Sequence, residues 1–462
     1  MGRTSDIAIE PPTAAGPGIV RAVEDRSYLG FIAAALASVL FGGLVFAVWI
    51  PLTMSGTVGG AGRLAWMVQA HGWVQVQGWA GLFVAGMAIR LIPRFAGRRP
   101  VPRRVTIPLL AVLAVPVVLR IALQTTARGG TADVVAMAIG VTTAAGAIGV
   151  AAVLAVTLSR GKKAKEPWRY FAWAGTVWWA GWALLALWNI PGSEAAPGLL
   201  EHRENDALLW AVMLGPVGNF IWAVQSRSVP IFYGRKTPQL VVAAVPGVLL
   251  NAGAALIAIG GADVETGQWS GGLGFVLAGT ALVSLPPICG SVYGQAKRLR
   301  PRARSAARFV VTANIAAMAA GALMVWGGLE VMGGDDYASW GAFEQRDAAR
   351  HLLGVGTITM LILGMARLVA PVFALERTEA GVPMLLERLP FWLLLGSLVL
   401  RAGVPLLGER LDYEAGRHTI ALAGMLAWLA VAIFAFSVAR AVRAEPRTKR
   451  ALDEVVRNAR RP

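Results

Sequence analysis

Long apolar runs separated by short polar loops dominate the hydropathy pattern of this chain. An α-helix needs about 20 mainly apolar residues to cross the hydrocarbon core of a bilayer. The pattern therefore predicts an all-α polytopic membrane protein, a bundle of twelve transmembrane helices. They are expected at residues 30–51, 67–94, 105–124, 132–159, 168–190, 206–233, 238–261, 271–296, 307–332, 348–374, 384–407 and 417–443.

The chain divides into a polar N-terminal arm (1–29), the transmembrane domain (30–443) and a basic C-terminal tail (444–462). The first apolar run begins too late and lasts too long for a cleaved signal peptide. Basic residues concentrate after the second, fourth, sixth and eighth runs, whereas the intervening loops are acidic or neutral. By the positive-inside rule, both termini are expected on the cytoplasmic side of the membrane.

Composition supports this class: 56% of the residues are hydrophobic and 15% are charged, against about 25% charged residues in soluble domains. The net charge of +17 does not indicate nucleic acid, because the basic residues lie in the loops that set membrane orientation. The single cysteine, Cys289, excludes an intrachain disulfide and a cysteine-based metal cluster.

The second apolar run contains a histidine, His71, near its start. An ionisable side chain inside a membrane span is costly, which makes it a candidate functional residue. Gln75 and Gly78 follow at i+4 and i+7 on the same helix face. We expect the glycine to let a flat macrocycle approach, and the glutamine to bond the imidazole or a ring substituent. The alternative is a histidine hydrogen-bonded at the membrane interface.

The tenth run begins with a second histidine, His351, and Gly354 lies on its face at i+3. Two helices that run in the same direction, each with a histidine near its outer end, are suited to bis-imidazole ligation of one haem b. Arginines at this height are candidates for binding the haem propionates, with anchoring of the helix ends as the alternative. They are Arg63, Arg346, Arg350 and Arg417.

The remaining two histidines are His418, at the start of the twelfth run, and His202, in the loop before the sixth. His418 is a second iron ligand, a propionate partner or a residue of the membrane interface. His202 is a solvated loop residue or a metal ligand. All four histidines of the chain are expected on the outer side of the membrane.

Residues in three runs carry a family resemblance. They are His71, Gly78–Trp79, Ala85–Gly86, Pro93 and Gly97 in the second run; His351, Leu352, Leu353, Val355, Gly356 and Ile358 in the tenth; and Arg227, Pro230 and Gly234 at the end of the sixth. In these residues the chain resembles the NnrS family, twelve-span membrane haem proteins linked to bacterial nitric oxide metabolism. The family's second histidine in span 2 is replaced by Trp73, which weakens the case for a second metal position there.

The architecture also resembles subunit I of haem–copper oxidases and nitric oxide reductases, which holds a haem between spans 2 and 10. That class uses six histidines for its two haems and its copper. This chain has four histidines and none in the sixth run, so a complete haem–copper binuclear centre is excluded by counting. The resemblance implies an oxidoreductase-like protein with one haem.

We therefore expect a membrane haem b protein with iron held by His71 and His351, acting in electron transfer or in nitric oxide binding and response. Two axial imidazoles make a low-spin haem, whereas a single ligand leaves a position open for nitric oxide. Expected partners are the lipid bilayer, nitric oxide or a redox partner, and other respiratory-complex subunits. The alternatives are a haem-free twelve-helix transporter and a structural subunit of a respiratory membrane complex.

Overall fold

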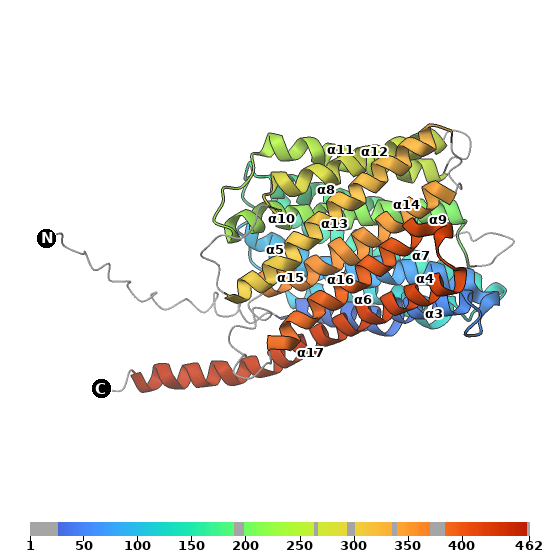
Figure 1. The fold of residues 1–462 in the computed structure, drawn as a ribbon. Coiled ribbons are helices and arrows are strands. Elements are labelled where there is room, and N and C mark those ends of the chain that lie inside the picture. The colour runs from blue at the N-terminus through green and yellow to red at the C-terminus, as the bar shows by residue number, and fades with distance from the viewer. Residues whose placement is uncertain are drawn as a thin grey trace.

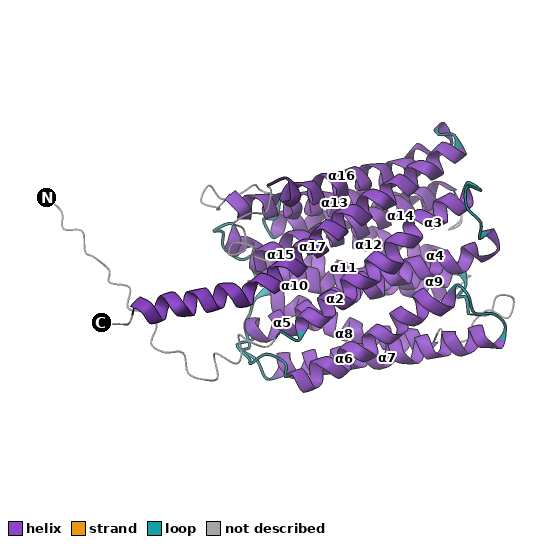
Figure 2. Ribbon diagram, turned by 90° about the horizontal axis from the view of Figure 1, so that it is seen from below, coloured by secondary structure: helices purple, strands orange, loops and turns teal. Residues whose placement is uncertain are grey.

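The computed structural model describes residues 26–188, 198–262, 267–292, 301–334, 340–369 and 384–459. All regular secondary structure of these residues is helical (Figure 2). The long helices run side by side and form one bundle (Figure 1). The predicted N-terminal arm lies outside the described residues up to residue 25.

The first four predicted spans are present, and three of them change helix type along their length. Span 1 contains α2 (Tyr28–Ser38), η1 (Val39–Gly43) and α3 (Leu44–Met54). Span 2 contains η2 (Ala61–Arg63), α4 (Leu64–Trp73), η3 (Val74–Gly81) and α5 (Leu82–Phe95). Span 3 contains α6 (Arg103–Leu119) and η4 (Arg120–Gln124), and span 4 is α7 (Gly130–Ser159).

The remainder of the chain continues the bundle. Its elements are α8 (Pro167–Trp188), α9 (His202–Val212), η5 (Met213–Gly218), α10 (Asn219–Phe232), α11 (Leu240–Ala262), α12 (Gly267–Ile288), α13 (Pro301–Met332), α14 (Trp340–His351), η6 (Leu352–Thr359), α15 (Met360–Val369), α16 (Met384–Leu407), η7 (Gly408–Arg410) and α17 (Tyr413–Ala459). Of these, η5 and η6 are π-helical, as are η1, η3 and η4, whereas η2 and η7 are 3₁₀ turns.

Eleven helices of the described residues are long and apolar enough to cross a membrane, which confirms a multi-pass membrane protein. The helix predicted at 168–190 is present as α8 and packs on α7 and α10, but it is not one of the eleven. Its six tryptophans are amphipathic and lower the mean hydropathy of the segment. The count of twelve spans therefore stays a prediction.

Three spans form the centre of the bundle. In the span of residues Ala61–Phe95, 94% of the most apolar stretch is buried, compared with 89% for His202–Phe232 and 72% for Glu344–Arg367. The other eight spans bury at most 56% of the corresponding stretch, because their outer faces have no protein neighbour. Helices 2, 6 and 10 of the prediction are thus surrounded by the others.

Each central span is interrupted by a π-helical segment, and these segments meet inside the bundle. Segment η3 contacts both η5 and η6, and it also contacts η1 of the first span. A π-helical turn bonds residue i to i+5, so it shifts the faces of the residues that follow it, and such turns are frequent at functional sites. The π-helical segments of the central spans therefore mark where a site is expected.

Several element ends differ from the prediction: α13 begins at Pro301 rather than 307, and α14 begins at Trp340 rather than 348 and has His351 as its last residue. Helix α12 ends at Ile288 rather than near 296, because Pro286 and Pro287 are followed by a turn in which Gly290 has φ of +69°. Helix α17 continues through most of the predicted C-terminal tail to Ala459 and extends beyond the bundle (Figure 1).

Candidate haem-binding site

The imidazole of His71 is fixed by the first span. Its Nδ1 lies 2.8 Å from the backbone carbonyl oxygen of Gly43, at the end of η1. A carbonyl oxygen only accepts hydrogen bonds, so Nδ1 carries the proton and Nε2 has a free lone pair. His71 is partly exposed, and no described residue hydrogen-bonds its Nε2. The side chain is therefore oriented and ready to bind a metal ion through Nε2.

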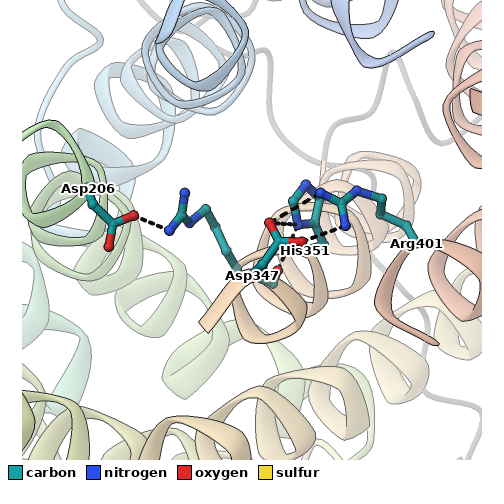
Figure 3. Close-up of polar contacts among 5 residues, drawn as sticks. Asp206, Asp347, His351 and Arg401 are labelled. Carbon is teal, nitrogen blue, oxygen red and sulfur yellow. Dashed lines mark hydrogen bonds and ion pairs between the residues drawn. The ribbon is translucent and has the colours of Figure 1, made fainter. Parts of the chain in front are cut away.

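His351 is held in the same way by its own helix. Its Nδ1 donates to the backbone carbonyl of Asp347 over 2.8 Å, and the Asp347 carboxylate lies 3.4 Å from the same nitrogen (Figure 3). This nitrogen is again the protonated one, and the exposed fraction of the side chain is 18%. Among the described residues none hydrogen-bonds Nε2 of His351. Both imidazoles thus have the tautomer that haem ligands adopt when their second nitrogen is hydrogen-bonded.

Asp347 is in turn paired with Arg401 of α16. Two bonds of 2.7 and 3.2 Å join the guanidinium to the two carboxylate oxygens (Figure 3). The fork is bidentate, which fixes the carboxylate beside the imidazole. Sequence analysis did not include this pair. Its signals were an aspartate at i−4 from His351 and a single arginine inside the apolar run of residues 390–407.

The structure brings the two histidines to the same region. His71 interacts electrostatically with Asp347, Arg350 and Arg401, and His351 interacts electrostatically with His71. The segments that follow the two histidines, η3 and η6, are in contact. Helices α4, α9, α14 and α17, which carry the four histidines, all begin at the same end of the bundle (Figure 1).

The two glycines that were expected to make room for a macrocycle have different surroundings. A Cβ atom on Gly354 would meet nothing within 4 Å, so the face of η6 beside His351 is open. A Cβ on Gly78 would lie 2.8 Å from Ser38 Oγ and 2.9 Å from Val117 Cγ1. Gly78 therefore allows the close packing of spans 1, 2 and 3, and its place beside a macrocycle stays a prediction.

Gln75, the other predicted neighbour of His71, packs against the first span. Its amide carbon and nitrogen lie 3.0 Å from the position that a Cβ on Gly43 would occupy. Because Gly43 has no side chain, Gln75 can pack against it. The carbonyl oxygen of Gly43 accepts the hydrogen bond from His71 Nδ1. Gln75 remains partly exposed, on the same side of the helix as His71.

The predicted propionate partners divide into two groups. Arg350 forms an ion pair with Asp206 of α9, and Arg346 lies 3.6 Å from the same carboxylate. Both belong to α14, close to His351. Arg63 donates instead to the carbonyl of Ala127 over 3.0 Å, and the Arg417 guanidinium lies 4.7 Å from the centroid of its own helix's Tyr413 ring.

The other two histidines have different roles in the structure. Nε2 of His418 lies 2.9 Å from the hydroxyl of Thr57, and Nδ1 lies 2.8 Å from the carbonyl of Glu414. With both nitrogens hydrogen-bonded and the side chain exposed, His418 matches the interface alternative. His202 is the exposed first residue of α9.

The residues around His71 and His351 include the kinds of group that hold a haem in proteins. Haem iron takes one or two axial ligands from the protein, and imidazole is the commonest of them. The described residues supply two imidazoles with free Nε2 atoms, an open face at Gly354 and arginines on the helix of His351. No protein-family model and no curated protein matches this chain.

Proposed function

We propose that this membrane protein binds one haem b between spans 2 and 10, with Nε2 of His71 and of His351 as the axial ligands. The observation that carries the proposal is the matched state of the two imidazoles. Each donates a hydrogen bond from Nδ1–H to a backbone carbonyl oxygen over 2.8 Å and leaves Nε2 free. His418 has the same Nδ1 contact, to the carbonyl of Glu414, but its Nε2 is hydrogen-bonded to Thr57, so the free Nε2 is what sets His71 and His351 apart.

The charged residues around His351 suit an anionic cofactor. Three arginines, Arg346, Arg350 and Arg401, surround two aspartates, Asp206 and Asp347. These five residues together carry one positive charge in excess, which favours an anionic group such as a haem propionate beside them. Arg350 retains 26% exposure of its side chain, so it is the arginine placed to contact a propionate.

The proposed activity is electron transfer or nitric oxide binding. A bound haem would supply reversible one-electron chemistry, and an axial position freed from histidine would bind nitric oxide. The protein's part is to hold both imidazoles in one tautomer, with the Asp347–Arg401 pair fixing the His351 side. Four histidines cannot supply a haem–copper binuclear centre, so the proposal includes no oxygen or nitric oxide reduction. This matches what the NnrS resemblance implies.

We further propose that the chain lies in a bacterial cytoplasmic membrane with both termini inside. The support is the concentration of basic residues in alternate loops. In this orientation the haem lies near the outer face, because the helices carrying the histidines begin at the end opposite the basic loops.

The experiment is a measurement of haem per protein after expression with a haem supply. Wild type is expected to retain about one haem, and His71→Ala and His351→Ala are each expected to lose most of it. His418→Ala is the matched control, because both nitrogens of that histidine already have partners. Full haem content in either of the first two variants would refute the ligand assignment.

A further inference from the structure

Span 3 contains a buried arginine, Arg120, that takes no part in the proposed haem site. Arg120 begins η4, inside the membrane-spanning segment Arg103–Gln124, and only 8% of the residue is exposed. A guanidinium stays charged under all ordinary conditions. An unpaired charge inside a membrane protein is costly, and such residues are usually paired or line a site.

The groups that contact Arg120 are all neutral. Its Nε donates to Gln77 Oε1 and its Nη1 to Gln124 Oε1, each over 3.2 Å. The guanidinium carbon lies 4.9 Å from the centroid of the Trp73 ring. Within the described part of the chain no carboxylate forms an ion pair with it, and Asp206 of α9 pairs with Arg346 and Arg350. The positive charge is therefore not balanced by the described residues.

Two of the surrounding amides, those of Gln77 and Gln124, turn their oxygens toward this cation, and Gln69 accepts a hydrogen bond from Gln124 behind them. The amide N–H of Gln77 donates a hydrogen bond to the hydroxyl of Thr143 over 2.9 Å. Gln124 donates to Gln69 over 2.9 Å, and Gln69 donates to the carbonyl of Leu200 over 3.3 Å. The dipoles of these linked amide side chains lower the free-energy cost of burying the charge, but they do not cancel the charge. Of the five N–H donors of the guanidinium, two are used, so three remain for a ligand.

These donors line a cavity of about 60 Å³. A water molecule needs roughly 10–15 Å³ measured in this way, so the cavity accommodates a group of a few heavy atoms. Its wall consists of Arg120, the surrounding polar side chains and the loop that leads to α9: Gln69, Trp73, Gln124, Thr143, Trp182, Gly198, Leu199 and Leu200 with aliphatic neighbours. The cavity thus combines an uncompensated cation, free donors and a small volume.

The cavity and the haem site lie on opposite sides of the same helix. Gln69 and Trp73 stand two residues before and two residues after His71, and side chains two positions apart point away from each other on a helix. Trp73 donates to Asn205 over 2.8 Å and stacks on Trp182 with ring centroids 6.4 Å apart. The inference about Arg120 therefore does not depend on haem binding.

We propose that this cavity binds one small monovalent inorganic anion, of the size of chloride or nitrate, against the guanidinium of Arg120. The anion balances the buried charge and accepts the remaining N–H donors. A divalent or bulky anion is excluded by the single charge and by the volume. Water alone would fill the space but would leave the charge uncompensated.

The test uses the full-length protein in detergent, with melting temperature measured at constant ionic strength in sodium gluconate, chloride or nitrate. Gluconate is too large for the cavity. Chloride and nitrate are expected to raise the melting temperature of the wild type saturably, by roughly 2 °C or more, because they bind the folded state. Arg120→Gln is expected to lose this response. Arg128→Gln, the same change at an exposed position of the adjoining loop, is expected to keep it.

A second measurement keeps the proposal testable if Arg120→Gln does not fold. Equilibrium binding of radioactive chloride to the wild type should show one saturable site that nitrate competes for and gluconate does not. Equal melting temperatures in the three salts, or the absence of saturable binding, would mean that the cavity holds only water. Equal loss of the response in both arginine variants would assign it to the protein surface. Each of these results would overturn the proposal.

Discussion

The indole N–H of Trp79 donates to the hydroxyl of Thr359 over 2.9 Å, which joins η3 of span 2 to η6 of span 10. Trp79 follows His71 by eight residues, and Thr359 follows His351 by the same number. The two helices begin at the same end of the bundle, so this bond sets them in register. Because the rise along both helices is similar, the two histidines lie at about the same depth. Paired axial ligands need this equality.

The register bond should stabilise the protein measurably. Trp79→Phe and Thr359→Val each remove it while keeping most of the side-chain volume. We expect each to lower the free energy of unfolding by about 0.5–1.5 kcal/mol. The double variant should cost less than the sum, with a coupling energy of about 0.5–1.5 kcal/mol in a double-mutant cycle. Strict additivity would show that the contact does not form.

The pair of Asp347 and Arg401 should matter for both stability and haem binding. Arg401→Gln leaves the carboxylate without its partner, and each side chain of the pair is only 19% exposed. We expect a loss of about 3 kcal/mol in thermal or denaturant unfolding, the low end for a broken buried pair. Asp347→Asn should lower haem affinity about tenfold, because it removes the carboxylate beside His351 and keeps the carbonyl contact.

The matched control for that experiment is the double variant Asp347→Asn with Arg401→Gln. It leaves neither charge without a partner, so it should recover a large part of the stability that Arg401→Gln loses. It should not recover the haem affinity. If the double variant were as unstable as Arg401→Gln alone, the ion pair would not be the cause.

Substitution by alanine should affect stability at one glycine of η6 and not at another. Gly356→Ala places a Cβ 2.7 Å from that of Ala316, so it should destabilise the protein by about 1–3 kcal/mol. Gly354→Ala meets nothing within 4 Å and should leave the stability of the haem-free protein unchanged. Gly354→Phe should lower haem content without lowering that stability. Normal haem content in Gly354→Phe would place the macrocycle elsewhere.

The fold was predictable from sequence because bilayer crossing imposes a simple pattern. A run of apolar residues of sufficient length has to be helical in lipid, since its backbone polar groups find no other partners. The prediction for 384–407 coincides with α16, for example. The π-helical segments were not predicted, because α- and π-helical turns differ by one residue of hydrogen-bond register rather than by composition. Four of the five contain glycine, which is too common here to serve as a signal.

The candidate site was predictable only in part. An ionisable side chain is costly to bury in a membrane span, so a histidine inside an apolar run indicates a site. His71 and His351 could be predicted in this way. Their partners could not, because Gly43 contributes a backbone carbonyl and Arg401 comes from a span that is distant in sequence. Gly78 illustrates the same limit: spacing places it on the face of His71, but only the packed helices show that Ser38 fills the space beside it.

The most direct test of the central claim is the absorption spectrum of the purified protein, recorded oxidised, reduced with dithionite, and reduced in the presence of nitric oxide. Ligation by both His71 and His351 predicts the sharp reduced bands of low-spin haem b, and these bands should not move when nitric oxide is added. Bands that shift with nitric oxide would contradict ligation by both histidines and would leave one axial position open. A spectrum without haem bands, after expression with an adequate haem supply, would contradict the account as a whole.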